Sequence, residues 1–139
     1  MHGPVAVETM TVFVPRDPAT CWRVFTDAGL LPAWVPGLRR AQVITKERGL
    51  ASEVHFEFAS SLTYTLVYTY DRENREVSWQ PKLGRRDGVS GFARFEPFDE
   101  GTRVILGPEP GDARSPAELE LGSLRVLAEA FTTWVRNQR

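Results

Sequence analysis

The chain has 139 residues with 17 basic and 18 acidic side chains, and its net charge of −1 gives no reason to expect a nucleic-acid partner. A single cysteine, Cys21, excludes an internal disulfide and a multi-cysteine zinc site. The length fits one domain, which we expect to span residues 1–139. No secretory signal is visible, and no apolar stretch approaches the roughly 20 residues that cross a bilayer, so we expect a cytoplasmic protein.

The first part of the chain predicts a strand followed by two short helices. Residues 5–14 are rich in β-branched side chains, as strands are. The Asp17-Pro18 pair is typical of a helix start, with a side-chain cap followed by proline at the first helical position. We expect this helix to run to about residue 27, with Gly29 as its stop. Residues 30–37 then predict a second short helix or turn.

Most of the remaining chain shows the period of two that is typical of half-buried strands. Val54, Phe56 and Phe58, for example, alternate with polar residues. Because each strand has one apolar face, we expect an antiparallel sheet that is packed on one side. The predicted strands cover residues 38–46, 53–59, 62–70, 76–80, 89–96 and 102–106.

A capping box over residues 115–118 (Ser-Pro-Ala-Glu) predicts the start of a long final helix. After it, apolar residues recur at steps of three and four and form one stripe. The stripe consists of Leu121, Leu124, Leu127, Ala128, Phe131, Trp134 and Val135. A curved sheet of about seven strands wrapped around this helix gives an α+β helix-grip fold, in which a cavity between sheet and helix is the natural site.

Three stretches resemble the START-like, or SRPBCC, superfamily of polyketide cyclase/dehydrase-like and lipid-transfer-like proteins. They are residues 17–27 (DPATCWRVFTD), residues 31–37 (LPAWVPG) and the last hairpin around residues 91–104. The resemblance covers nearly the whole chain and implies the helix-grip fold. Where this group commonly has a large aromatic residue, the chain has Ala93, which is expected to enlarge or reshape the cavity.

The side chains expected to face the cavity come from the inner faces of the strands and from the helical stripe. They could simply fill the core, or they could line a pocket in which tyrosine hydroxyls meet a ligand carbonyl or hydroxyl. The candidates are Phe56, Phe58, Tyr64, Leu66, Tyr68, Trp79, Ala93, Phe95, Leu124, Leu127, Phe131 and Trp134.

No catalytic constellation is visible, and we expect no cofactor and no metal. His55 and Glu57 share the outer face of one strand and could contact a metal, but no third ligand is apparent. Cys21 is expected in the core. The loop over residues 81–88 is either a solubilising hairpin tip or a contact for an anionic surface or ligand group. Its basic side chains are Lys82, Arg85 and Arg86.

Three functions remain open from the sequence. The first is binding or transport of a small apolar, aromatic or lipid-like ligand. The second is a cyclase, aromatase or dehydratase, which an ionisable residue in the cavity would favour. The third is a protein-interaction module, which an exposed apolar patch without a cavity would favour. The absence of inward-facing His, Asp and Glu in the predicted register favours the first, while the ligand and the oligomeric state are not determined.

Overall fold

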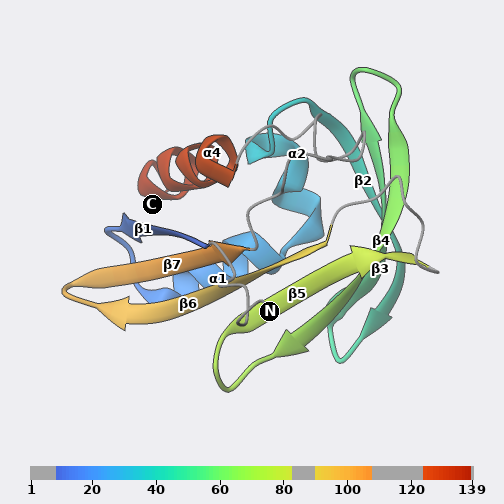
Figure 1. The fold of residues 1–139 in the computed structure, drawn as a ribbon. Helices are drawn as coiled ribbons and strands as arrows, with labels where there is room; N and C mark the ends of the chain where they lie inside the picture. Colours follow the sequence, from blue (N-terminus) through green and yellow to red (C-terminus); the bar gives the residue numbers. More distant parts are fainter. Residues whose placement is uncertain (1–8, 83–89, 108–123, 139) are drawn as a thin grey trace, which may run out of the picture.

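The computed structural model describes residues 9–82, 90–107 and 124–138. Its strands form one antiparallel sheet of seven, in the order β1-β7-β6-β5-β4-β3-β2 (Figure 1). The strands are β1 (Met10–Val14), β2 (Leu38–Glu47), β3 (Leu50–Phe58), β4 (Thr63–Asp71), β5 (Glu76–Pro81), β6 (Gly91–Phe98) and β7 (Gly101–Gly107). The helical elements are α1 (Pro18–Thr26), the 3-10 turn η1 (Ala28–Leu30), α2 (Leu31–Trp34) and α4 (Leu124–Arg136). This confirms the predicted α+β helix-grip fold.

The two short helices are separated by a side-chain cap and not by the predicted glycine stop. Asp17 caps α1 as expected, accepting a hydrogen bond from the Thr20 amide (3.2 Å). The helix ends at Thr26, however, and Gly29 lies inside η1, where its amide donates to the Asp27 carboxylate (2.9 Å). Asp27 thus starts a new helical turn at the point where α1 ends.

The strand boundaries follow the predicted pattern with two main corrections, the first being that β3 begins at Leu50 and not at residue 53. β6 continues through Pro97 and Phe98, which were predicted to belong to the turn, because the reversal occurs at Asp99, whose φ is 53°. Some predicted features lie outside the described residues: residues 5–8, Val89, Arg85, Arg86, the capping box at 115–118 and Leu121.

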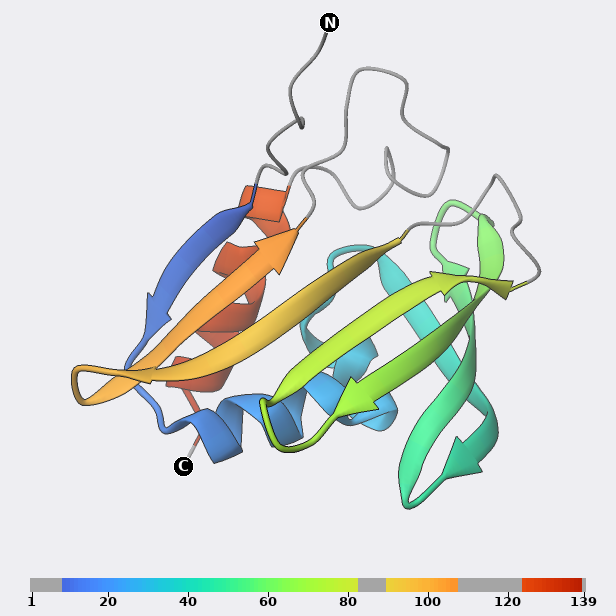
Figure 2. The ribbon, with the colours of Figure 1, turned by 60° about the horizontal axis from the view of Figure 1, so that its bottom comes forward.

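The concave face of the sheet is covered by all the described helices together. α4 packs against β1 and β7, α1 packs against β6, and α2 packs against β2 (Figures 1 and 2). The final helix, around which the sheet was expected to wrap, therefore shares this role with α1 and α2. The sheet is curved, and α4 lies at its β1 end. The short helices therefore cover the strands that lie farther from β1 in the sheet.

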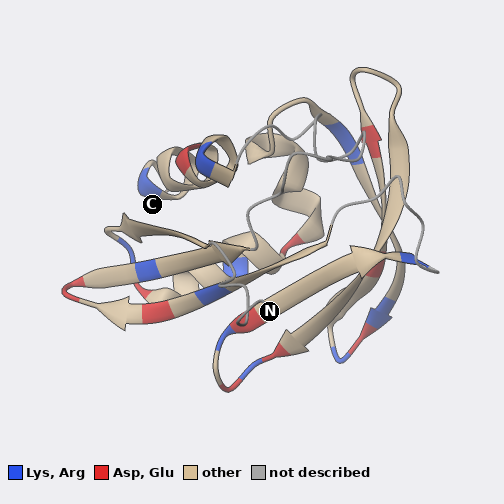
Figure 3. Cartoon of the chain, viewed as in Figure 1, with Lys and Arg blue, Asp and Glu red and all other residues tan. Residues whose placement is uncertain are grey.

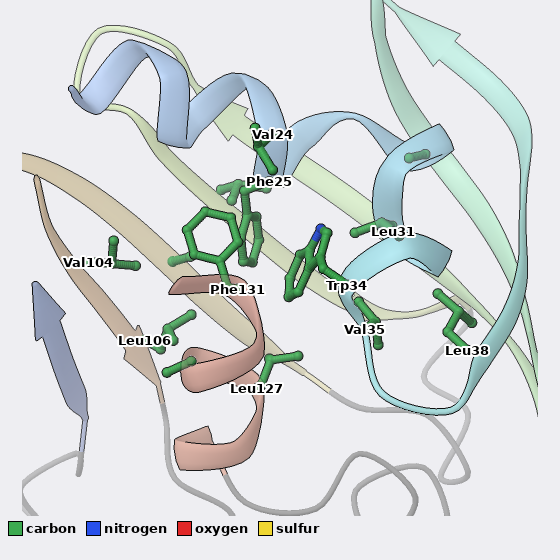
Figure 4. Close-up of a cluster of buried hydrophobic side chains, with 14 of the residues drawn as sticks. Val24, Phe25, Leu31, Trp34, Val35, Leu38, Val104, Leu106, Leu127 and Phe131 are labelled. Atoms are coloured by element: carbon green, nitrogen blue, oxygen red, sulfur yellow. The ribbon is translucent and has the colours of Figure 1, made fainter. Parts of the chain in front are cut away.

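The apolar stripe of α4 faces this core. Leu127, Ala128, Phe131 and Val135 are buried, as their spacing predicts. The ring of Phe131 lies 5.4 Å from that of Phe25 and 5.0 Å from that of Trp34, measured between centroids (Figure 4). One aromatic cluster thus joins α4, α1 and α2.

Arg16 ties the end of α4 to the start of α1. Its Nη2 donates to the backbone oxygens of Arg136 (2.6 Å) and Gln138 (3.0 Å). The last carbonyls of a helix lack partners inside the helix and carry partial negative charge, so a guanidinium there is doubly favourable. The backbone oxygen of Arg16 accepts a hydrogen bond from the buried Thr102 hydroxyl (2.6 Å), which holds this junction to β7.

We expect Arg16→Ala to lower the free energy of unfolding by about 1–2 kcal/mol, the usual range for losing hydrogen bonds from a charged donor at a partly exposed site. Urea unfolding followed by circular dichroism would measure the change. The matched control is Arg23→Ala on the exposed side of α1, which should cost less than about 0.5 kcal/mol. Equal losses in the two variants would show that Arg16 does not stabilise the end of α4.

Charged residues of both signs are interspersed along the strands (Figure 3), which also expose the large apolar side chains of Phe13, Ile44 and Phe98. Arg94 pairs with Glu76 (2.9 Å), and Lys82 pairs with Glu53 (3.2 Å). His55 lies within hydrogen-bond distance of the Thr65 hydroxyl (2.9 Å). In the described part of the chain, no three His, Cys, Asp or Glu side chains are grouped as a metal site would need, and no helix there is long and apolar enough to cross a membrane.

Candidate functional site

A small, partly open cavity of about 50 Å³ lies between the short helices and strands β3 to β5. Its walls are apolar and mainly aromatic. The lining residues are Phe25, Leu31, Trp34, Val35, Phe56, Tyr64, Leu66, Tyr68, Trp79 and Leu127. Leu127 is the lining residue that α4 supplies, so the cavity lies in front of the short helices more than under the final helix.

The sheet register brings the strand residues of the lining together. Phe56 pairs with Tyr64 across β3 and β4, and Tyr68 pairs with Trp79 across β4 and β5. Residues of one strand that are two apart share a face, so Tyr64, Leu66 and Tyr68 point to the same side. Gly91 is opposite Trp79, and a Cβ at this glycine would lie 2.8 Å from the indole ring. Glycine therefore allows the Trp79 ring to lie across β6.

The short helices supply the facing wall. Phe25 comes from α1, Leu31 and Trp34 come from α2, and Val35 follows directly. Trp34 is 5% exposed, and its Nε1 has no hydrogen-bond acceptor among the described residues. Figure 4 shows this nitrogen on the ring edge turned away from Leu127. A buried N–H without an acceptor costs about 1–3 kcal/mol, so such groups are uncommon unless water or a ligand meets them.

Six of the twelve predicted cavity residues line this space: Phe56, Tyr64, Leu66, Tyr68, Trp79 and Leu127. The other six do not: Phe58, Ala93, Phe95, Leu124, Phe131 and Trp134. The main reason is Phe25, whose ring lies 5.4 Å from Phe95 and 5.4 Å from Phe131 and fills the space between β6 and α4. Ala93 is fully buried and does not enlarge the cavity. A role in ligand binding stays a prediction for all twelve.

Four lining residues were not among the candidates: Phe25, Leu31, Trp34 and Val35. A signal for them was present in the sequence. The Pro-Ala-Trp-Val-Pro stretch places a tryptophan between two prolines, where its backbone is held by a short turn. The direction of that turn relative to the sheet depends on the packing of α1, which no local pattern encodes.

Two tyrosines of β4, Tyr68 in the cavity wall and Tyr70 beyond the cavity, are held in their neutral form. Burial raises the pKa of Tyr68 well above its usual value, and burial raises the pKa of Tyr70 to about 12. Both hydroxyls are therefore hydrogen-bond donors at neutral pH and poor bases. In the part of the chain that the structure describes, the ten lining residues include no acidic side chain, no basic side chain and no cysteine. The cavity thus offers hydrogen-bond donors at an aromatic wall.

Comparison with known families agrees with this architecture. The family model described as "polyketide cyclase / dehydrase and lipid transport" matches residues 6–134, which is most of the chain. The chain belongs to this family. The description covers both enzymes and lipid carriers, so membership leaves the choice between them open. Among curated proteins, none matches the chain.

Solved structures similar to this family member share its fold. A START superfamily protein from Mycobacterium smegmatis has a TM-score of 0.70 and 19% identity, covering 91% of this chain and 94% of that one. The TTHA0849 protein from Thermus thermophilus has a TM-score of 0.69 and 19% identity, covering 92% and 95%. The Zhui aromatase/cyclase from Streptomyces sp. R1128 has a TM-score of 0.60 and 18% identity, covering 93% and 87%. At these identities the likeness concerns the fold alone.

Proposed function

We propose that this protein binds a small aromatic or otherwise apolar molecule that carries a hydrogen-bond acceptor, with the cavity of β3 to β5 and the short helices as its site. The observation that carries the proposal is the buried Trp34 Nε1, which lacks an acceptor among the described residues of an otherwise apolar wall. A carbonyl or hydroxyl oxygen of the ligand would supply that acceptor, while the ring faces of Phe25 and Trp79 would contact its apolar body.

Binding is favoured over catalysis by the composition of the lining. General acid–base chemistry usually needs a group that titrates near neutral pH, and the ten lining side chains within the described residues contain no His, Asp, Glu or Lys. The raised pKa of Tyr68 keeps its hydroxyl protonated, so that it can donate to a ligand oxygen. Tight packing leaves only about 50 Å³ free, whereas ligand pockets usually have about 300–1,000 Å³, so a ligand must displace at least one side chain.

We expect Trp34→Phe to weaken binding about 3- to 10-fold, the value of one neutral hydrogen bond. The ligand is first chosen by thermal shift from a panel of flavones, naphthols, quinones and fatty acids, since a molecule that binds the folded state raises the melting temperature. Its affinity for the wild type and the variant is then measured by fluorescence titration.

Trp22→Phe is the matched control for this experiment. Trp22 lies on α1, is half-buried, and packs edge-on against Tyr70 and Phe95 without lining the cavity. The control should keep the wild-type affinity within about twofold. Equal losses in the two variants, or no saturable binding by any member of the panel, would contradict the proposed site.

A second candidate is a cyclase of the aromatase type, for which the tyrosines are the relevant observation. Tyr64 and Tyr68 lie on the same face of β4 and both line the cavity, so two phenol groups border one space. Such groups can hold a reactive carbonyl in one conformation and polarise it. Conversion of a linear poly-β-ketone thioester analogue to an aromatic product, lost in Tyr68→Phe, would favour this candidate over simple binding.

A further inference from the structure

The sheet opens between β3 and β4 at the end remote from their hairpin. The last paired residues of these strands are Glu53 and Val67. Beyond them, the Leu50–Ser52 end of β3 continues to pair only with β2, while the Tyr68–Asp71 end of β4 continues to pair only with β5. A groove of about 480 Å³ lies at this opening. It is lined by Glu47, Arg48, Leu50, Ser52, Tyr68, Thr69, Tyr70, Asp71 and Arg72.

Tyr68 lines both this groove and the small cavity, so the two spaces meet at this residue. The Tyr68 ring lies 6.1 Å from the Tyr70 ring and 6.2 Å from the Trp79 ring, measured between centroids. In the described regions, no hydrogen bond holds the Tyr68 hydroxyl, whereas Tyr70 donates to the Ala51 oxygen at 2.6 Å. Rotation of Tyr68 thus breaks no hydrogen bond of the described chain, and rotation of Tyr70 breaks one.

The described residues that line the groove carry balanced charge. Glu47 and Asp71 are acidic, Arg48 and Arg72 are basic, and the Arg72 guanidinium donates to the Arg48 backbone oxygen across the opening. A site with two charges of each sign gives no net attraction to an anion or to a cation. Its Ser52 and Thr69 hydroxyls suit uncharged oxygen atoms.

We propose that the groove is the outer compartment of the ligand site and that Tyr68 turns aside to join it to the small cavity. This inference rests on the proposed function. The ligand is then an elongated, uncharged and oxygen-bearing aromatic molecule, with one ring system against Trp34 and Trp79 and a polar end between β3 and β4. The cavity by itself is too small for a ligand, but the groove of about 480 Å³ falls within the size range of ordinary ligand sites.

The first test fills each compartment separately and uses 3-hydroxyflavone, an elongated neutral fluorescent probe. Ser52→Trp fills the groove, and we expect it to weaken binding at least about tenfold. Thr45→Val is its matched control, because Thr45 and Ser52 share a hydroxyl hydrogen bond (2.5 Å) that both variants lose while only one fills the groove. Leu66→Trp fills the small cavity and is expected to abolish binding. Circular dichroism confirms that each variant is folded.

The outcomes separate this inference from the proposed function. If Leu66→Trp abolishes binding and Ser52→Trp binds as Thr45→Val does, the cavity binds the probe and the groove inference is wrong. If Leu66→Trp binds like the wild type, or the wild type shows no saturable binding, both the proposed site and the groove inference are overturned. Loss of binding in Leu66→Trp and Ser52→Trp, with Thr45→Val unchanged, supports both.

The second test concerns the movement of Tyr68 and uses stopped-flow fluorescence with the same probe. If rotation of this side chain limits passage, Tyr68→Ala should raise both the association and the dissociation rate constants by about tenfold or more. A residue that only contacts the ligand would change the dissociation rate alone. Unchanged association in Tyr68→Ala would therefore overturn the role of Tyr68 as a movable wall.

Discussion

Phe131→Ala is expected to lower the free energy of unfolding by about 3–5 kcal/mol, the usual cost of removing a buried phenylalanine side chain. Phe131 is 1% exposed and contacts aromatic rings from three elements: Phe25 of α1, Trp34 of α2 and Phe95 of β6. The loss of stability should lie near the top of this range. The neighbouring rings belong to three different elements, so they cannot easily move together to fill the space that the Phe131 side chain leaves. Urea unfolding would measure it.

Thr133→Ala is the control for this prediction, since Thr133 is exposed on the same helix and its loss should cost less than about 0.5 kcal/mol. Phe131→Leu should be intermediate, because it keeps part of the buried volume. A loss below about 1.5 kcal/mol in Phe131→Ala would mean that α4 is not anchored to the short helices through this ring.

Stability is expected to fall as the pH rises from about 9 to about 12, by roughly 1 kcal/mol or more at about pH 11. The folded-state pKa of Tyr70 is raised to about 12 from 10.0, and burial shifts the pKa of Tyr68 in the same direction. A raised folded-state pKa means that the unfolded chain releases its proton first. The stabilisation is therefore complete below the unfolded-state pKa and is lost as the pH passes through the folded-state pKa.

Urea unfolding at a series of pH values, with tyrosinate absorbance as a second readout, would check this expectation. A shift of one pKa unit corresponds to about 1.4 kcal/mol of stability. Tyr70 is only half-buried, so solvent screening makes its contribution smaller than this value. Tyr70→Phe and Tyr68→Phe should each make the loss of stability at alkaline pH smaller. Lysine side chains titrate in the wild type and in both variants alike, so they do not cause a difference between the three proteins. The same pH dependence in both variants and the wild type would show that these tyrosines are not its source.

The proposed site combines a buried polar group with a cavity that is smaller than a ligand. A cavity of about 50 Å³ holds water molecules at most, yet Trp34, one of its lining residues, has a buried indole nitrogen without an acceptor among the described residues. In the proposed complex a ligand oxygen reaches that nitrogen as the lining side chains move, and the groove between β3 and β4 receives the remainder of the ligand.

The sequence by itself determined the elements and their inner faces. Alternation by two placed Val54, Phe56 and Phe58 toward the core, and steps of three and four did the same for Leu127 and Phe131. Both periods arise from local backbone geometry, so a one-dimensional pattern suffices to read them. The order of the elements then predicted the fold, because hairpins place successive strands side by side.

Only the tertiary structure decided which inward-facing residues meet empty space. Phe95 and Phe131 face inward as predicted, but Phe25 occupies the volume between them, while Trp34 faces a part of the sheet that is distant from it in the sequence. The opening between β3 and β4 has the same origin, because β2 and β5 draw the two strand ends apart. The periodicity of apolar residues in the sequence indicates which way a side chain points. Whether a cavity forms depends on the volumes of all the side chains that converge on that space.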